Sequence, residues 1–192
     1  SSGLKHFYDV IWRVYHALMS VGSALVITLS PFIARVLMQR QFYSAWPLIS
    51  ILVLAFYLSA INNFLGTIYQ AYMRTKPLLV ATVVGAAACL AFTAILVHDW
   101  GISAAAFGVF VGSLVIFVVR VIDVRRLMAI NMRPIPTAIT MTLLTVQSLV
   151  TSNQCNHYLF WSSICLLLIA FVQCYELKPL ITLIFTRRKY TA

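Results

Sequence analysis

The feature that most constrains this chain is a series of long segments without a charged residue. Between Arg40 and Arg74, for example, no Asp, Glu, Lys or Arg occurs. About 20 mostly apolar residues let an α-helix cross the roughly 30 Å hydrocarbon core of a membrane. Only 9% of the residues are charged, and the mean hydropathy is +0.94, whereas a soluble domain carries about 25% charged residues. The chain is therefore neither an ordinary soluble domain nor a disordered one.

Six segments are apolar enough to cross a membrane as helices: residues 14–34, 47–73, 77–97, 102–119, 136–151 and 158–174. Proline opens three of them, at Pro47, Pro77 and Pro136, and proline suits the first turn of a helix. The segment 136–151 is rich in threonine and is the weakest of the six. We predict an all-α fold, a polytopic bundle of about six transmembrane helices with short connections. Residues 179–185 are too short to span; they either extend the last helix or lie at the membrane interface.

The basic residues predict how such a bundle is oriented. If the six segments cross in turn, twelve of the 14 Lys and Arg fall on the side that holds both termini, and only Arg35 and Arg40 fall on the other. Loops rich in Lys and Arg stay in the cytoplasm, so we predict that both termini are cytoplasmic. The net charge of +10 then reflects topology and attraction to anionic membrane lipids, and we expect no nucleic-acid partner.

Residues suited to catalysis are scattered. The four acids lie outside the apolar segments or at their ends, and the four histidines show no metal-binding spacing. The four cysteines form no CxxC pair. We therefore predict no catalytic residue, no metal and no cofactor. Of the charged groups, Arg120, Asp123 and Arg126 recur every three residues, which predicts a solvated face of one helix.

A few polar residues inside the apolar segments are candidates for substrate binding. Arg13 and His16 are predicted in the first turns of the first span, where they could meet an anionic substrate, although Arg13 could equally snorkel to the head groups. Asn62, Asn63 and Gln70 lie in the second span. Adjacent helical residues point about 100° apart, so one of the two asparagines could bond a neighbouring helix while the other faces a cavity.

Small residues predict one tight helix pair. Gly85 is followed by three alanines, and Gly108 and Gly112 form a GxxxG motif. Small residues let transmembrane helices approach closely. We therefore predict that residues 77–97 pack against residues 102–119 as a hairpin, with the three glycines at the contact.

Several segments together resemble one family of transporters. Residues 62–77 (NNFLGTIYQAYMRTKP) look like a recurrent segment of bacterial polysaccharide flippases of the Wzx type. Residues 100–105 (WGISAA) are similar to a motif that opens the next helix in that family, with Ser103 in place of the usual glycine. Residues 30–33 and 42–47 resemble the preceding helix end and loop. The resemblance covers roughly residues 8–132, and the last two spans match no motif.

This resemblance implies a place within a larger transporter. The family belongs to the superfamily of multidrug and toxic-compound extrusion proteins, which have two six-helix lobes. It implies that residues 1–133 are the closing four spans of a C-terminal lobe and that residues 134–192 are a terminal helix pair with a basic cytoplasmic tail. A register in which the six spans form the whole second lobe stays open. The chain starts at Ser1-Ser2-Gly3 without an initiator methionine, and we expect it to be a C-terminal piece of a longer protein.

The implied function is transport across the bacterial inner membrane. The cargo would be an undecaprenyl-diphosphate-linked oligosaccharide used for O-antigen, capsule or exopolysaccharide synthesis. The implied partners are this lipid-linked oligosaccharide, membrane lipids, the missing N-terminal part of the protein, and polysaccharide polymerase or chain-length proteins. Three alternatives stay open: a multidrug or cation antiporter of the same superfamily, a membrane-embedded polysaccharide polymerase or acyltransferase, and a scaffolding subunit.

Overall fold

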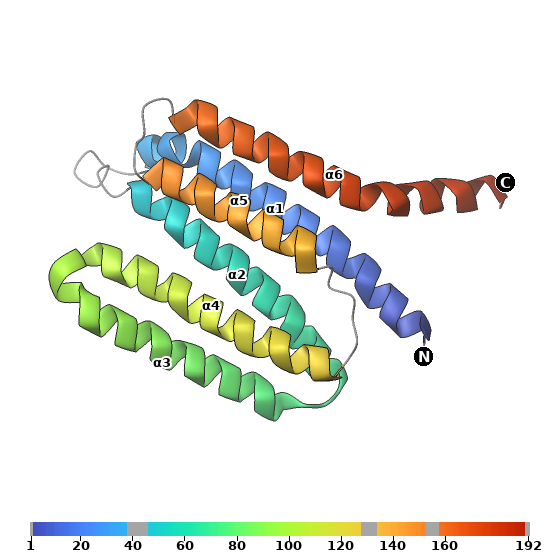
Figure 1. The fold of residues 1–192 in the computed structure, drawn as a ribbon, viewed down its shortest axis with the longest axis horizontal. Coiled ribbons are helices and arrows are strands. Elements are labelled where there is room, and N and C mark those ends of the chain that lie inside the picture. Colours follow the sequence, from blue (N-terminus) through green and yellow to red (C-terminus); the bar gives the residue numbers. More distant parts are fainter. Residues whose placement is uncertain (1, 38–45, 128–133, 153–157, 191–192) are drawn as a thin grey trace.

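The computed structural model describes six helices joined in an up-and-down order (Figure 1). It describes residues 2–37, 46–127, 134–152 and 158–190, and side chains within 7–36, 46–124, 136–152 and 158–178. Arg40 and Arg133 lie outside the described residues. No strand occurs in the described ranges, which confirms the predicted all-α class.

The helices are α1 (Ser2–Leu37), α2 (Trp46–Ala71), α3 (Thr75–Trp100), α4 (Ile102–Leu127), α5 (Pro134–Ser152) and α6 (Tyr158–Tyr190). Five of them are long and apolar enough to cross a membrane, over Phe7–Val36, Trp46–Ala71, Thr75–Trp100, Ile102–Val124 and Tyr158–Lys178. The molecule is therefore a multi-pass membrane protein by the length and composition of these helices.

The helix that is not among these five spans is α5, which contains the segment 136–151, the weakest of the six predicted spans. Its 19 residues extend about 28 Å at 1.5 Å per residue, and it packs against α1, α2 and α6. Several of its polar residues are turned inward: Thr140, Gln147 and Thr151 are fully buried, whereas Ile139, Val146 and Leu149 are exposed. An inward polar face lowers the mean hydropathy of this helix while leaving an apolar face outside.

The predicted helix ends were wrong at several places. The first helix starts at Ser2 and not near residue 14, so Arg13 and His16 lie three to four turns inside α1 rather than in its first turns. α4 continues to Leu127. For residues 179–185 the first of the two alternatives holds, since α6 continues through Pro179 to Tyr190. The connection between α3 and α4 is Gly101 alone. Five helices end beyond the predicted apolar segment, because charged and polar residues also propagate a helix where it leaves the hydrocarbon. The exception is α2, which ends at Ala71, two residues before the predicted end at residue 73.

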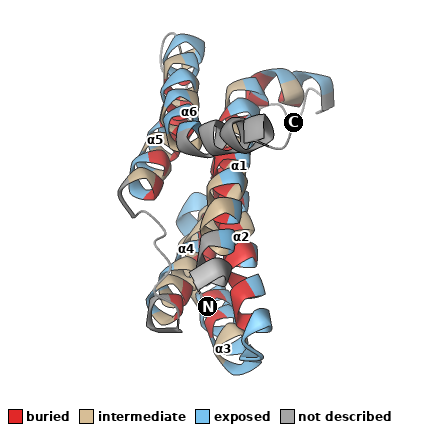
Figure 2. Cartoon of the chain, turned by 90° about the vertical axis from the view of Figure 1, so that its right-hand side faces the viewer, coloured by how far each residue is buried: buried red, intermediate tan, exposed pale blue. Residues whose placement is uncertain are grey.

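Two groups of helices meet at α2. On one side α2 contacts α4, which pairs closely with α3; on the other side it contacts α1 and α5, and α6 covers α1 and α5. Figure 2 shows the buried residues concentrated where α1 and α2 face their neighbours. In α3 only Ala81 and Gly85 are buried, so most of its surface faces outward.

The bundle core is aromatic and aliphatic. Tyr57, Ile61, Leu65, Ile68 and Tyr69 of α2 form its centre, and they are joined by residues from four other helices: Trp12, Ala24, Ile27, Val124, Leu144 and Ile169. The Phe64 ring packs on Trp12 and Tyr15 of α1, with ring centres 5.2 and 5.4 Å apart. This core holds α1 and α2 in register, and the buried polar groups described next are embedded in it.

Candidate functional site

A chain of polar side chains crosses the bundle interior at His16. This histidine on α1 is only 4% exposed. Its Nε2 atom lies 2.9 Å from the Tyr57 hydroxyl of α2, and its Nδ1 atom lies 3.3 Å from Nε2 of Gln173 on α6. The Gln173 amide also donates to Thr140 Oγ1 of α5 at 3.1 Å. One connected set of hydrogen bonds, the His16 network (His16, Tyr57, Thr140, Gln173), thus links four helices.

With the Gln173 amide oriented with Nε2 towards the ring, one tautomer of His16 satisfies both of its hydrogen bonds. Gln173 Nε2 is a donor, so the Nδ1 atom that it faces accepts. A neutral imidazole then carries its proton on Nε2 and donates to the Tyr57 oxygen. The side chain of Glu176, one turn beyond Gln173 on α6, acts electrostatically on His16. The Trp12 ring packs beside the imidazole with centres 5.6 Å apart.

A second buried cluster is built on Gln147 of α5. The Gln147 amide nitrogen lies 3.0 Å from the Ala24 carbonyl oxygen, 3.0 Å from Thr28 Oγ1 and 3.0 Å from Ser162 Oγ. The Thr28 and Ser162 hydroxyls are themselves 3.1 Å apart. This Gln147 cluster (Ala24, Thr28, Gln147, Ser162) joins α1, α5 and α6. Along α1 the cluster lies about 12 Å (Ala24) to 18 Å (Thr28) from His16, given a rise of about 1.5 Å per residue. We call the His16 network and the Gln147 cluster together the polar seam.

The third polar centre is Arg120 of α4, which corrects the prediction of a solvated face. Arg120 is 6% exposed. Its guanidinium donates to the Asn62 backbone oxygen of α2 and, at 3.0 Å, to Thr82 Oγ1 of α3. Its Nε atom is buried with no hydrogen-bond partner among the described residues. Asp123 is half-buried, and the side chain of Arg126 is not described. The i, i+3 spacing predicts a solvated face, but α2 and α3 cover Arg120, its first member.

The residues of α2 that contact α4 recur along one face. Asn62 donates through Nδ2 to the Ser113 backbone oxygen at 2.9 Å, and the Tyr69 hydroxyl donates to the Arg120 backbone oxygen at 3.3 Å. Between them, a Cβ atom added at Gly66 would lie 3.7 Å from the Arg120 Nη1 atom. Residues spaced by four and three share a helix face. Asn62, Gly66 and Tyr69 therefore form one surface that holds the Arg120 segment of α4.

The five residues predicted to bind substrate do not come together. His16 and Asn62 are buried, at 4% each, but they belong to separate polar sets. Asn63 and Gln70 are exposed on α2, and Arg13 is half-buried on α1. Asn62 bonds α4, which is one of the two roles foreseen for the asparagine pair. None of the five shares a described pocket with another.

The three glycines predicted at the helix contact lie between α3 and α4. A Cβ atom at Gly85 would come within 2.2 Å of Ile116 Cγ1 and 2.9 Å of the Gly112 oxygen. One at Gly108 would come within 2.1 Å of Thr93 Oγ1, and one at Gly112 within 2.8 Å of Cys89 Cβ. Any side chain at these positions would force the two helices apart. Glycine is therefore required for this close approach.

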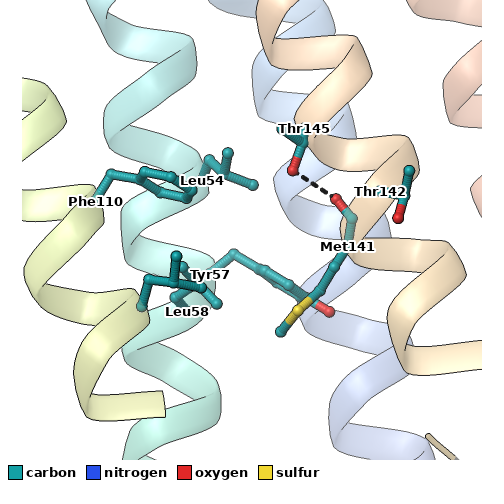
Figure 3. A pocket seen from close by; sticks show the side chains of 8 residues that line it. Leu54, Tyr57, Leu58, Phe110, Met141, Thr142 and Thr145 are labelled. Carbon is teal, nitrogen blue, oxygen red and sulfur yellow. Dashed lines mark hydrogen bonds between the residues drawn. The ribbon is translucent and has the colours of Figure 1, made fainter. Parts of the chain in front are cut away.

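Open spaces between the helices include a groove and a pocket that are lined by described residues. The α2–α5 groove, of about 300 Å³, is lined by Leu54, Tyr57, Leu58, Phe110, Leu114, Met141, Thr142 and Thr145. Figure 3 shows Tyr57 reaching from α2 towards Met141 across this groove. Tyr57 thus contacts both the groove and His16. The second space, the α3–α4 pocket, has a volume of about 510 Å³ and is lined by Tyr69, Lys76, Pro77, Val80, Val119, Ile122 and Asp123.

The sequence contained the signal for the polar residues that were missed. Gln147 and Gln173 each stand inside a predicted span, as Asn62 does, and a polar residue in an apolar span is costly unless it is bonded. Applied to all six spans, that argument selects Gln147 and Gln173. Arg120 and Tyr57 carry no such signal, because an arginine at a helix end and a tyrosine in a span are both common.

Metal binding finds no support in the part of the chain that is described, where no three His, Cys, Asp or Glu side chains gather. An exposed ion pair joins His98 Nδ1 and Asp99 Oδ1 at 3.4 Å. Comparison with known proteins gives no matching family model, no similar curated protein and no similar solved structure.

Proposed function

We propose that this multi-pass membrane protein is part of a transporter that flips undecaprenyl-diphosphate-linked oligosaccharides across the bacterial inner membrane. The observation that carries the proposal is the polar seam along α1. Soluble proteins bury polar groups for many reasons, but in a membrane helix they are costly and mark pathways for polar cargo. The seam lies where α1 and α2 meet α5 and α6, which are the contacts that a rocking bundle would open.

The buried amides leave acceptors available for such a cargo. Gln147 Oε1 and Gln173 Oε1, both in the seam, are buried without a hydrogen-bond partner among the described residues, as is Asn62 Oδ1 at the α2–α4 contact. Each amide therefore uses its nitrogen to hold a neighbouring helix and keeps its oxygen free. Sugar hydroxyls are hydrogen-bond donors, so an opened seam would offer them acceptors. A transporter of this kind forms no bond, and we expect it not to be an enzyme.

The resemblance of residues 62–77 to Wzx-type flippases adds a second support. In this chain Asn62, Gly66 and Tyr69 of that segment hold the buried Arg120. The segment that carries the resemblance thus also fixes the position of a cation inside the bundle. A buried cation is suited to an anionic diphosphate cargo.

The test is where the lipid-linked repeat units accumulate. Cells that lack the full-length gene should retain these units on the cytoplasmic leaflet, which an impermeant glycosidase reaches in inside-out but not in right-side-out vesicles. Gln147→Leu in the full-length protein should cause the same retention at normal protein level, whereas Thr142→Val, an exposed change on the same helix, should not.

Two results would contradict the proposal. If the units reach the periplasmic leaflet but stay unpolymerised, the protein acts after flipping, as a polymerase or another membrane enzyme would. If the units are distributed normally and the cells become sensitive to cationic drugs, the protein is an antiporter.

A further inference from the structure

The α3–α4 pocket combines apolar walls with two opposite charges at one end. Lys76 and Asp123 both line it. Lys76 is the second residue of the apolar span Thr75–Trp100, and Asp123 is the last but one of Ile102–Val124. Both charges therefore lie at the depth where a helix leaves the hydrocarbon and meets lipid head groups.

The walls become apolar one turn further into the membrane. Val80 lies four residues after Lys76, and Val119 lies four residues before Asp123, so each is one turn deeper on the same face of its helix. Ile122 completes this wall and is 51% exposed, and Val80 is 55% exposed. The pocket is therefore polar at the membrane surface and apolar towards the bilayer centre, which is also how a phospholipid is built.

Lys76 and Asp123 do not neutralise each other in a salt bridge. Within the described ranges no ion pair joins Lys76 to Asp123. The Oδ2 atom of Asp123 is buried and has no hydrogen-bond partner there. Tyr69 lines the same pocket, and its hydroxyl donates to the Arg120 backbone oxygen at 3.3 Å. The Asp123 carboxylate and the separate Lys76 ammonium together favour a ligand that carries both a positive and a negative charge.

We propose that the α3–α4 pocket binds a phospholipid whose head group carries a primary ammonium, such as phosphatidylethanolamine. The ammonium donates to the Asp123 carboxylate, the phosphate lies at Lys76, and the acyl chains lie along Val80, Val119 and Ile122. The volume of about 510 Å³ falls within the range of about 300–1,000 Å³ that is usual for pockets that bind small molecules. Phosphatidylcholine has the same phosphate, but its trimethylammonium has no N–H to donate, so it should bind more weakly.

The experiment counts bound lipids by native mass spectrometry. The protein, extracted from its membrane in a mild detergent, is incubated with equal concentrations of phosphatidylethanolamine, phosphatidylglycerol or phosphatidylcholine. We expect phosphatidylethanolamine to bind several-fold more than phosphatidylcholine. Asp123→Asn should remove this preference and leave phosphatidylglycerol binding unchanged or stronger. Lys76→Gln should weaken phosphatidylethanolamine and phosphatidylglycerol alike.

Two further variants separate binding from folding. Val80→Trp fills the pocket from an exposed position and should reduce phosphatidylethanolamine binding without lowering the unfolding temperature. Asp99→Asn removes an exposed acid at the opposite end of α3 and should change nothing. The proposal is overturned if phosphatidylethanolamine and phosphatidylcholine bind equally, if Asp123→Asn keeps the preference, or if phosphatidylglycerol binds best to the unaltered protein. It does not depend on the transported cargo, so its failure would leave the proposed function untouched.

Discussion

At the scale of single residues, two adjacent amides show how surroundings decide the role of a side chain. Asn62 is 4% exposed and bonds Ser113 of α4, whereas Asn63 is exposed. The two side chains have the same chemistry and the same depth in α2, and they differ only by the turn of about 100° between successive helical residues. This pair is therefore an internal comparison of a bonded and an unbonded amide.

Asn62→Ala should destabilise the protein, and Asn63→Ala should not. Interhelical hydrogen bonds in membranes contribute about 0.6 kcal/mol on average and about 1.7 kcal/mol at most, and Asn62→Ala also leaves the Ser113 oxygen without this donor. Unfolding of each variant in mixed micelles with a denaturing detergent measures the change in unfolding free energy that each substitution causes. Equal effects of the two substitutions would mean that the α2–α4 bond contributes nothing.

The residue scale also shows what a sequence can reveal about such a bundle. Apolar segments located the helices, because the cost of charge in hydrocarbon is large and local in the sequence. The contact between Gly85 and Gly112 could also be predicted from the sequence, because small residues in a membrane span usually mark a close helix–helix contact. The burial of Arg120 was not foreseeable, because it depends on α2 and α3 covering α4. The meeting of His16 with Gln173, 157 positions away, likewise depends on how the helices are arranged.

At the scale of elements, α5 is attached to the bundle by a polar face. Gln147 is fully buried and reaches both α1 and α6, and the Ser50 hydroxyl of α2 donates to the Ser148 oxygen at 3.4 Å. In lipid the hydrophobic effect does not drive helices together, so packing and hydrogen bonds determine the association. The position of α5 therefore depends more on Gln147 than on its apolar residues.

Gln147→Leu should loosen α5 more than any change on its outer face. The substitution removes the donor to Ala24, Thr28 and Ser162 while keeping a similar volume, and we expect a loss of about 1–2 kcal/mol of unfolding free energy. Thr142→Val is the matched control, because Thr142 is exposed and bonds only its own helix, at the Ala138 oxygen. Hydrogen exchange of α5 amides in micelles measures the difference. Equal exchange in the two variants would contradict a polar attachment.

At the scale of the whole molecule, the two ends of the bundle differ. Figure 1 shows the start of α1 and the end of α6 at one end of the bundle, together with the connection between α2 and α3. Arg74, Lys76 and Lys178 belong to that end, whereas the opposite end carries aromatic residues at helix termini, namely Trp46, Trp100, Tyr158 and Trp161. Trp46 and Tyr158 pack there with ring centres 5.6 Å apart. Aromatic residues gather at membrane interfaces, and an excess of Lys and Arg stays in the cytoplasm.

Reporter fusions should place the basic end in the cytoplasm. A fluorescent protein fused after Ala192 should fluoresce, and alkaline phosphatase fused there should be inactive. Alkaline phosphatase inserted after Gly101, in the connection between α3 and α4, should be active because that connection lies at the opposite end. The reverse pattern would mean that the basic residues do not set the orientation of this chain.

The single residue between α3 and α4 has a consequence for how the protein is made. Gly101 alone joins the two helices, with φ of +53°, and glycine is the residue that adopts such a conformation most readily. Its neighbours Trp100 and Ile102 already belong to the helices. Because this connection is so short, α3 cannot insert into the membrane during synthesis while α4 is still far from it. We expect the two helices to leave the ribosome and enter the bilayer as a preformed hairpin, already closed at its glycine face.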